Sequence, residues 1–396
     1  MGGNGVSPCR EKKGPGVTPS PFELQKRSIL NEIRSAKKDI WDLTISSPMQ
    51  AGIIFDIASD LHYLAENPEW QFNAPDACGQ SYAREAIAEY GEKATNPENI
   101  FITSSSSESY SALFQVFCKK GDCILTPAPG YPLIDTLAEL AGLNTHPYFL
   151  KPCFGKEPRW EIDLDSLDSI PPNTKILLLI SPHNPTGHIP GKKELEHILQ
   201  FCEKNKLALI IDCVFAAYGF CNREDNRKGY PYGCCNIPIF LLDGLSKSAG
   251  LPHIKVGWIN AVVPEEQKRH IYDSLEYILD SQLNCSYLSQ ALCARVLPRA
   301  GDFQKRVIER LKANRILLGD YFSKMGAKII PSAGGWYQSF YFPNADDEKL
   351  CLNLLKERQI LTHPGFLFDF EDGWLVGSLL QNSPANHASV EYTFSA

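Results

Sequence analysis

Three polar side chains, Asn184, Asp212 and Lys247, follow one another as an amide, a carboxylate and an amine, each just after a hydrophobic run. The three runs are residues 176–180, 207–211 and 239–242. Each is apolar and short enough to form a buried strand. In an open parallel sheet, ligands bind beyond the carboxyl ends of the strands. An amine, a carboxylate and an amide brought to that edge could hold one polar cofactor.

Each of the three side chains also has an ordinary interpretation. A lysine is most often a solvated charge, but Lys247 lies between Ser246 and Ser248 after a predicted buried strand. A primary amine in such a place can condense with an aldehyde and then carry protons. Asp212 could keep a bound ring nitrogen protonated, or it could cap the loop after its strand. Asn184 precedes a proline, and this pairing is also a plain turn signal.

The order and spacing of these motifs resemble the fold type I pyridoxal phosphate (PLP) enzymes, specifically the class I/II aminotransferases, from about residue 40 to about residue 385. The resemblance implies pyridoxal 5′-phosphate as cofactor and an α/β fold. Its large domain would have a mostly parallel sheet sandwiched by helices, beside a smaller α+β domain. Lys247 would form the Schiff base and move the substrate proton. Asp212 would face the pyridine nitrogen and Asn184 the ring 3-oxygen.

The resemblance also implies where the rest of the cofactor lies. Tyr131 would stack on the ring, although it could equally be a core tyrosine. The serine run at 105–107 would offer backbone N–H groups to the phosphate at a helix start, or it could be a plain loop. Lys255, eight residues after Lys247, stands where the family usually has arginine and would neutralise the phosphate as a point charge. The implied cofactor contacts are Ser105, Ser106, Ser107, Tyr131, Asn184, Asp212, Phe215, Ser246, Lys247 and Lys255.

Three departures from the family pattern concern hydroxyl groups. Phe215 replaces a tyrosine that often donates to the ring 3-oxygen, and its loss predicts a raised pKa for the Schiff base. Gly244 stands where a hydroxyl is common, three residues before the lysine. Phe72 stands at the position assigned to a tyrosine that reaches the neighbouring subunit's phosphate.

The fourth departure concerns the substrate. Val376 occupies the place of an arginine whose fork holds the substrate α-carboxylate in common members of the family. Another cation could supply this contact, the substrate could be held differently, or the register could differ. His363 and Trp336 lie on segments expected to border the substrate. A structural role for His363 is as plausible as a catalytic one.

Strands and helices alternate through the middle of the chain, which predicts a parallel sheet with crossover helices. A strand at 176–180, a helix opening near Pro190 and a strand at 207–211 form one right-handed βαβ unit. The other expected elements are a strand at 100–103, a helix at 109–117, a strand at 123–126, a helix at 303–323 and strands at 328–330 and 336–340.

A chain of 396 residues predicts more than one domain. We expect a flexible tail at 1–21 without a secretory signal, and a PLP-binding large domain at 52–285. The small domain is expected to combine 22–51 with 286–396.

Composition indicates an ordinary globular enzyme. A net charge of −7 argues against a nucleic-acid partner, and no apolar run is long enough to span a membrane. The 13 cysteines form no disulfide-like framework, so we expect a reducing, cytoplasmic location. The chain has neither the glycine pattern of a dinucleotide site nor that of a P-loop.

The resulting hypothesis is an aminotransferase of amino-acid metabolism that moves an amino group between an L-amino acid and a 2-oxo acid through a Lys247 Schiff base. Such enzymes form their site at a homodimer interface, so a homodimer is expected. The general sequence pattern is closest to that of family members that use alanine or aspartate. Two alternatives stay open, a PLP-dependent lyase or cyclase on the same fold and a non-catalytic PLP-binding protein.

Overall fold

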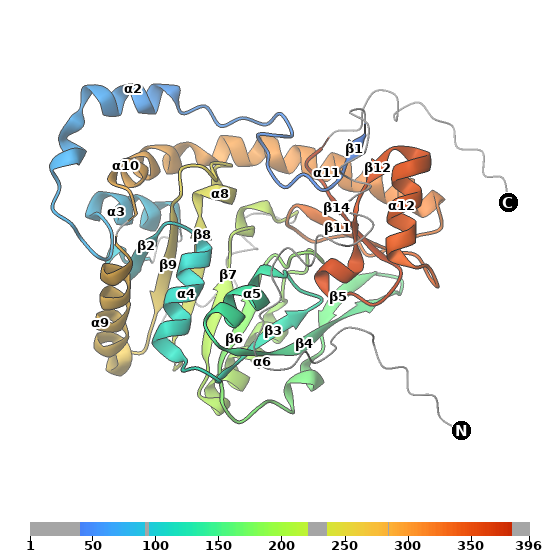
Figure 1. Ribbon diagram of the computed structural model, residues 1–396, viewed down its shortest axis with the longest axis horizontal. Helices are drawn as coiled ribbons and strands as arrows, with labels where there is room; N and C mark the ends of the chain where they lie inside the picture. Colours follow the sequence, from blue (N-terminus) through green and yellow to red (C-terminus); the bar gives the residue numbers. More distant parts are fainter. Residues whose placement is uncertain (1–39, 92–94, 221–235, 284, 382–396) are drawn as a thin grey trace, which may run out of the picture.

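The computed structural model describes residues 40–91, 95–220, 236–283 and 285–381. A mixed eight-stranded sheet lies at its centre, in the order β2-β9-β8-β7-β6-β3-β4-β5 (Figure 1). These strands are β2 (Ile100–Thr103), β9 (Gly257–Val262), β8 (Ile239–Gly244), β7 (Ala208–Asp212), β6 (Thr174–Ile180), β3 (Cys123–Ala128), β4 (Asn144–Cys153) and β5 (Arg159–Ile162). Strands β8, β7, β6, β3 and β4 are parallel, whereas β9 is antiparallel to both neighbours and β5 is antiparallel to β4.

Helices cover both faces of this sheet. On β6, Ile176 and Leu178 pack with helices α4, α5 and α9, whereas Leu177 and Leu179 pack with α6 on the other face. The helices are α4 (Ser106–Phe117), α5 (Leu133–Leu140), α6 (Lys192–Asn205) and α9 (Glu265–Gln282). Because both faces are buried, the central positions of β6 (residues 176–180) and β7 (residues 208–211) need apolar side chains, which explains their continuous hydrophobic runs.

The C-terminal part forms a separate antiparallel sheet in the order β10-β11-β14-β13, beside helix α12 (Asp347–Arg358) (Figure 1). Its strands are β10 (Lys328–Ile329), β11 (Tyr337–Tyr341), β14 (Trp374–Ser378) and β13 (His363–Pro364). Nearby, β1 (Trp41–Asp42) pairs in parallel with β12 (Ile360–Leu361), so the start of the described chain joins its C-terminal part. The predicted fold class, a large α/β domain with a smaller α+β domain, is confirmed. The predicted tail and the outer parts of the small domain, residues 1–39 and 382–396, lie outside the described residues.

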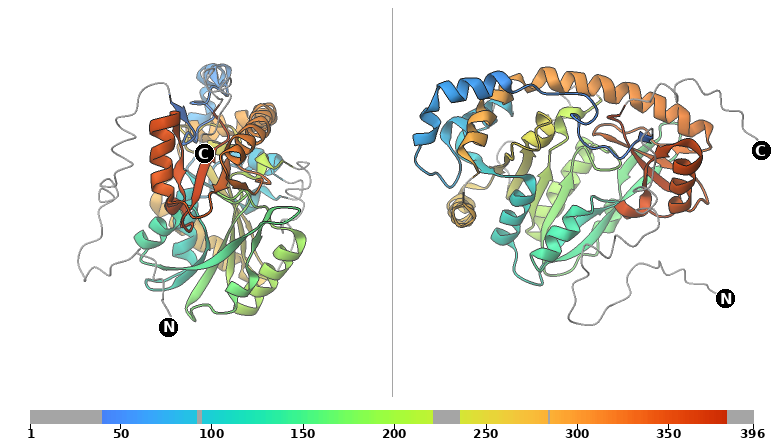
Figure 2. Two further views of the ribbon diagram at one scale, coloured as in Figure 1. Left: turned by 90° about the vertical axis from the view of Figure 1, so that its right-hand side faces the viewer. Right: turned by 45° about the horizontal axis from the view of Figure 1, so that its top comes forward.

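The remaining helices line the top and one end of the molecule. Helix α11 (Ala300–Lys324) runs from α10 toward the small sheet, and α2 projects above α3 and α10 (Figure 2). The bounds are α2 (Ala58–Glu66), α3 (Ser81–Tyr90), α8 (Leu245–Ser248) and α10 (Tyr287–Val296). Short 3-10 helices include η2 (Pro68–Phe72) and η5 (Ala216–Tyr218). In the described ranges, no helix combines the length and apolarity required to cross a membrane.

Several predicted boundaries were wrong by a few residues. Helix α4 begins at Ser106 rather than at residue 109, because the Ser105 hydroxyl accepts the N–H of Glu108 at 3.2 Å and caps the helix. Helix α6 begins at Lys192, after Pro190, because the Glu194 carboxylate accepts the N–H of Gly191 at 2.8 Å. In both places a side chain, rather than hydrophobic periodicity, determines where the helix begins.

Candidate active site

Asp212 is the last residue of β7 and is buried. Its Oδ2 accepts a hydrogen bond from the Tyr110 hydroxyl at 2.6 Å, and its Oδ1 accepts one from the backbone N–H of Val214 at 3.0 Å. Burial raises the pKa of Asp212, whereas the two donors and the charge of Lys247 act against this rise. Burial, with the Asp212 charge beside it, raises the pKa of Tyr110 well above its ordinary value. Tyr110 therefore keeps its proton and remains a donor to the carboxylate.

Lys247 lies on the one-turn helix α8, directly after β8. Its Nζ lies 4.7 Å from the ring centroid of Trp336 and 5.5 Å from that of Phe215. Burial lowers the pKa of Lys247 to about 8, although the Asp212 charge opposes the shift. The Tyr218 hydroxyl donates to the Lys247 carbonyl and so holds the backbone at this point. A larger share of the amine is thus neutral at pH 7 than in a solvated lysine, as a nucleophile requires.

Asn184 lies in a tight turn that follows β6. The backbone N–H of His183 donates to the carbonyl of His188, and the N–H of Gly187 donates to the carbonyl of His183, both at 2.7 Å. Before the turn, the N–H of Ser181 donates to the Asp212 carbonyl at 2.9 Å, so the two motifs lie side by side. Asn184 is buried, and its Oδ1 has no hydrogen-bond partner among the described residues. A ligand can therefore take this amide without breaking a protein contact.

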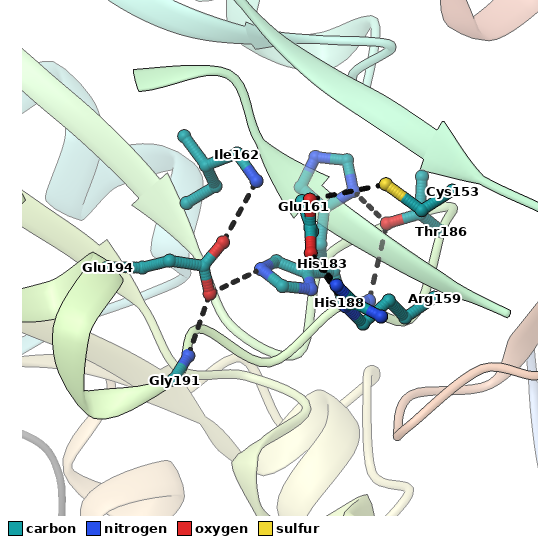
Figure 3. A network of polar contacts seen from close by, with 9 residues as sticks. All are labelled: Cys153, Arg159, Glu161, Ile162, His183, Thr186, His188, Gly191 and Glu194. Atoms are coloured by element: carbon teal, nitrogen blue, oxygen red, sulfur yellow. Dashed lines mark hydrogen bonds and ion pairs between the residues drawn. The ribbon is translucent and has the colours of Figure 1, made fainter. Parts of the chain in front are cut away.

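A polar network fastens this turn to its surroundings (Figure 3). Thr186 Oγ1 bonds to His183 Nδ1 at 2.8 Å and accepts the N–H of His188 at 3.2 Å. His188 Nε2 pairs with Glu194 at 3.2 Å, and the same carboxylate accepts the N–H of Ile162 at 2.9 Å. Burial lowers the pKa of His183 to about 3, with His188 adding to the effect, so His183 is neutral. The network links the Asn184 turn to α6 and to β5.

The serine run forms the start of α4. Ser105 is the N-cap, and Ser106 and Ser107 are the first two helical residues. A Cβ on Gly257 would lie 2.6 Å from the Ser105 carbonyl carbon, so only glycine lets β9 approach the helix start this closely. Helix N-termini bind anions through their backbone N–H groups. Tyr110, one turn further along α4, contacts Asp212, which places this N-terminus one helical turn from the buried carboxylate.

The structure gives the surroundings of four further predicted contacts. Phe215 is buried, and its ring centroid lies 5.3 Å from that of Trp336. Tyr131 is partly exposed; burial and the Asp212 charge raise its pKa. Lys255 is exposed, has a left-handed backbone, and lies two residues before the close approach of β9 to α4. Ser246, half-buried, belongs to the same helical turn as Lys247.

Val376 lies in β14 between two neutral polar residues. It is paired across the sheet with Ser339 on one side and His363 on the other. Burial lowers the pKa of His363, with Asp42 opposing, so this imidazole is neutral near pH 7. Ser339 Oγ is buried and has no partner among the described residues. This row of the small sheet thus carries hydroxyl and imidazole groups in place of a cation.

The class I and II aminotransferase family matches residues 65–378, most of the chain. The chain belongs to this family of PLP-dependent enzymes. Tyrosine aminotransferase of Dictyostelium discoideum is 28% identical over 355 residues, which cover 84% of this chain and 82% of that protein. The S-alkyl-thiohydroximate lyase SUR1 of Arabidopsis thaliana is 26% identical over 299 residues. This match covers 72% of the present chain and 63% of the lyase.

A solved structure has the same fold. The crystal structure of tyrosine aminotransferase from Leishmania infantum superposes with a TM-score of 0.79 at 21% sequence identity, covering 94% of this chain and 95% of that chain. At this identity the likeness establishes the fold of the aminotransferase and leaves its substrate open.

The residues of the aminotransferase fit its cofactor. The unpartnered Asn184 Oδ1, the buried Asp212 carboxylate and the Lys247 amine offer a polar contact for a hydroxyl, a ring nitrogen and an aldehyde, respectively. The narrow approach of Gly257 to Ser105 supplies the kind of backbone cradle that a phosphate requires.

Two tyrosines of this site were not found from the sequence. Tyr110 lies three to four residues after the serine run, on the same helical face, so this spacing could have indicated it. Tyr218 contacts Lys247 across 29 positions and has no local signal.

Proposed function

We propose that this chain transfers an amino group between an L-amino acid and a 2-oxo acid, with Lys247 as the residue that binds the cofactor and moves the substrate proton. The observation that carries the proposal is a partly buried amine with a pKa of about 8 near a buried carboxylate held by two donors. Groups with such opposed shifts are typical of sites that carry out proton transfer.

The proposed roles follow from what each side chain can donate or accept. Bound PLP supplies an electron sink that acidifies the α-hydrogen of the amino acid. Asp212, whose charged form is favoured by the hydrogen bonds from Tyr110 and Val214, would hold a proton on the ring nitrogen. Asn184 takes the ring hydroxyl, and Tyr131 and Phe215 flank the ring. The phosphate contacts are Ser105, Ser106, Ser107 and Lys255, with Ser246 beside Lys247.

Neutral Lys247 is the proton carrier of this proposal. Its amine, once released, accepts the proton from the substrate α-carbon as a general base and gives a proton back as the conjugate acid. The hydrophobic faces of Phe215 and Trp336 exclude water from this amine. Such exclusion keeps the neutral amine poorly solvated, which favours its action as a base.

The amino donor that we propose is an aromatic L-amino acid such as tyrosine. The relatives from Dictyostelium and Leishmania carry the name tyrosine aminotransferase. The buried rings of Trp336 and Phe215 lie beside Lys247 Nζ, and Phe215 packs against Tyr337 with ring centroids 6.4 Å apart. Aromatic pairs at this separation are favourable beyond the area that they bury.

The molecular setting belongs to the same proposal. We infer a homodimer, a large domain at 52–285, and a small domain formed by 22–51 with 286–396. A cytoplasmic location is supported by the nine described cysteines, all of which are free thiols.

The test is the absorbance of the purified, cofactor-loaded enzyme during addition of single L-amino acids, followed by single 2-oxo acids. We expect tyrosine to convert the cofactor band to that of the aminated cofactor, and a 2-oxo acid to restore it. The Lys247→Ala variant is expected to lose this interconversion. A wild-type band that no amino acid changes would contradict the proposal and favour a non-catalytic binding protein.

A second candidate is cleavage of a carbon–sulfur bond on the same fold, because one relative is named a lyase. The same proton abstraction by Lys247 would then expel a β-substituent. Ammonia and a 2-oxo acid released from an S-substituted cysteine without any amino acceptor would favour the lyase. Amino transfer that requires an acceptor would exclude it.

A further inference from the structure

The ammonium of Lys247 has aromatic rings where a buried cation usually has an anion. Its Nζ lies over the indole of Trp336 at 4.7 Å and over the Phe215 ring at 5.5 Å. Among the described residues, no carboxylate lies within ion-pair distance of Nζ, and Asp212 acts on it from further away. The negative face of an aromatic ring attracts a cation, most strongly for tryptophan and most strongly out of water.

Trp336 is held firmly in this position. It is buried, and its ring packs edge-on against Phe215 at 5.3 Å and Tyr218 at 5.1 Å. The backbone N–H of Gly335 donates to the Tyr218 carbonyl at 3.0 Å, and Leu379 donates to the Trp336 carbonyl at 2.8 Å. No hydrogen bond within the described part of the chain holds Nε1, so packing alone sets the plane of the indole.

The segment that precedes Trp336 also contacts the Asn184 turn. The backbone N–H groups of Ala333 and Gly334 both donate to the Gly187 carbonyl at 3.1 Å. A Cβ on Gly187 would lie 2.3 Å from the Ser332 Cβ, and its φ is +71°, so glycine is required at this contact. One segment leading into β11 therefore contacts both the Lys247 side chain and the turn that carries Asn184.

We propose that Trp336 is a positioning residue for Lys247, whose indole face holds the ammonium of the cofactor-free enzyme and so sets how readily that amine gives up its proton. This inference rests on the proposed function, in which Lys247 is the reactive amine. Phe215, where the family resemblance places a tyrosine, completes the aromatic surface without adding a hydrogen-bond donor. The small sheet thereby acts on an amine that belongs to the large sheet.

The test replaces Trp336 site-specifically with tryptophan analogues carrying one, two or three ring fluorines, which withdraw electron density from the ring face with little change in shape. In the cofactor-free enzyme, the rate of carbamylation of Lys247 by cyanate is measured against pH by mass spectrometry. We expect the midpoint of this pH–rate profile to fall stepwise with each added fluorine, by about one pH unit over the whole series. Trp336→Phe is expected to have an intermediate midpoint.

The matched control is the same analogue series at Trp160. This buried tryptophan packs against Phe370 and Trp374, with a ring-centroid distance of 5.1 Å to Trp374. Fluorination there should leave the Lys247 midpoint unchanged. A midpoint independent of fluorination at Trp336 would overturn the inference, even if Trp336→Leu alters it through shape. The carbamylation assay contains no cofactor and is therefore separate from the assay of amino transfer. An enzyme that transfers amino groups but whose Lys247 midpoint does not depend on fluorination at Trp336 would refute the positioning role and leave the proposed function intact.

Discussion

At the scale of single residues, the site depends on two ionisable groups whose pKa values move toward each other. Burial raises the pKa of Asp212 and lowers that of Lys247, and in both cases the opposite charge limits the shift. Within the described ranges, neither group has an ion pair that would fix its charge completely. Both are therefore available to a ligand that brings a ring nitrogen and an aldehyde.

The first prediction concerns the pH dependence of Lys247. With a pKa of about 8, the neutral fraction of the amine rises about tenfold from pH 7 to pH 9 and then levels off. The cofactor-free enzyme is mixed with PLP, and the initial rate of capture is followed by absorbance. After the absorbance of unbound PLP is subtracted at each pH, this rate should show the same profile. A rate that keeps rising tenfold per pH unit up to pH 10 would show an ordinary, solvated lysine.

The second prediction concerns the Tyr110 hydroxyl. Tyr110→Phe removes one donor from the buried Asp212 carboxylate, and a hydrogen bond to a charged group is worth about 1.5–3 kcal/mol. The pKa of Asp212 should rise further, so the variant should bind PLP at least tenfold more weakly, measured by fluorescence titration.

Tyr148→Phe is the matched control for Tyr110→Phe. The Tyr148 hydroxyl is also buried, but it donates to the Leu178 carbonyl at 2.9 Å. Its loss should lower the free energy of unfolding and leave PLP affinity unchanged. Equal PLP affinities for the two variants would refute the role given to Tyr110.

At the scale of elements, the site is assembled by chain segments that follow strands. The β6 end carries the Asn184 turn, the β7 end carries Asp212, and the β8 end leads into α8 with Lys247. Strands β6, β7 and β8 are adjacent and parallel, so their carboxyl ends meet at one edge. The rigidity of the connecting turns then decides how accurately the side chains are placed.

The third prediction tests the turn at residues 183–188. Thr186→Val keeps the shape of the side chain and removes its two contacts, to His183 and to His188. Because the turn aims Asn184, we expect PLP affinity to fall about tenfold, together with a loss of about 1–3 kcal/mol in the free energy of unfolding.

Thr174→Val provides the control for this change. Its hydroxyl donates to the Pro171 carbonyl at 2.7 Å, at the opposite end of the same strand β6. This variant should lose stability and retain PLP affinity. A Thr186→Val enzyme that loses stability but binds PLP normally would show that the network supports the fold without aiming Asn184.

At the scale of the whole molecule, the sequence predicts the central strands and the order of the motifs well. Continuous apolar runs identify β6 and β7 because both faces of these strands are buried, and a polar residue such as Asp212 marks where the run ends. Strands of two residues, such as β13, contain no period to detect. The contacts of Tyr110 with Asp212 and of Trp336 with Lys247 join distant segments, so only the tertiary fold brings them together.

The fourth prediction concerns assembly. Exposed apolar side chains lie on α2, η2, α9 and α10 at one end of the molecule (Figure 1), among them Phe72 with 83% and Tyr277 with 78% of their surface exposed. A second copy of the chain covering this end would remove the exposed apolar area. Phe72→Asp with Tyr277→Asp should convert a dimer to a monomer in light scattering. Leu140→Asp, at a side chain also 78% exposed but located on α5, should leave the dimer intact.

The most direct test of the account locates the covalent attachment of the cofactor. Purified enzyme is loaded with PLP, reduced with borohydride and digested, and the modified peptide is identified by mass spectrometry. We expect the pyridoxyl group on Lys247 and on no other lysine, with no stoichiometric label in Lys247→Ala. Stoichiometric modification of a different lysine, or none in the wild-type enzyme, would contradict the assignment of Lys247 as the reactive amine.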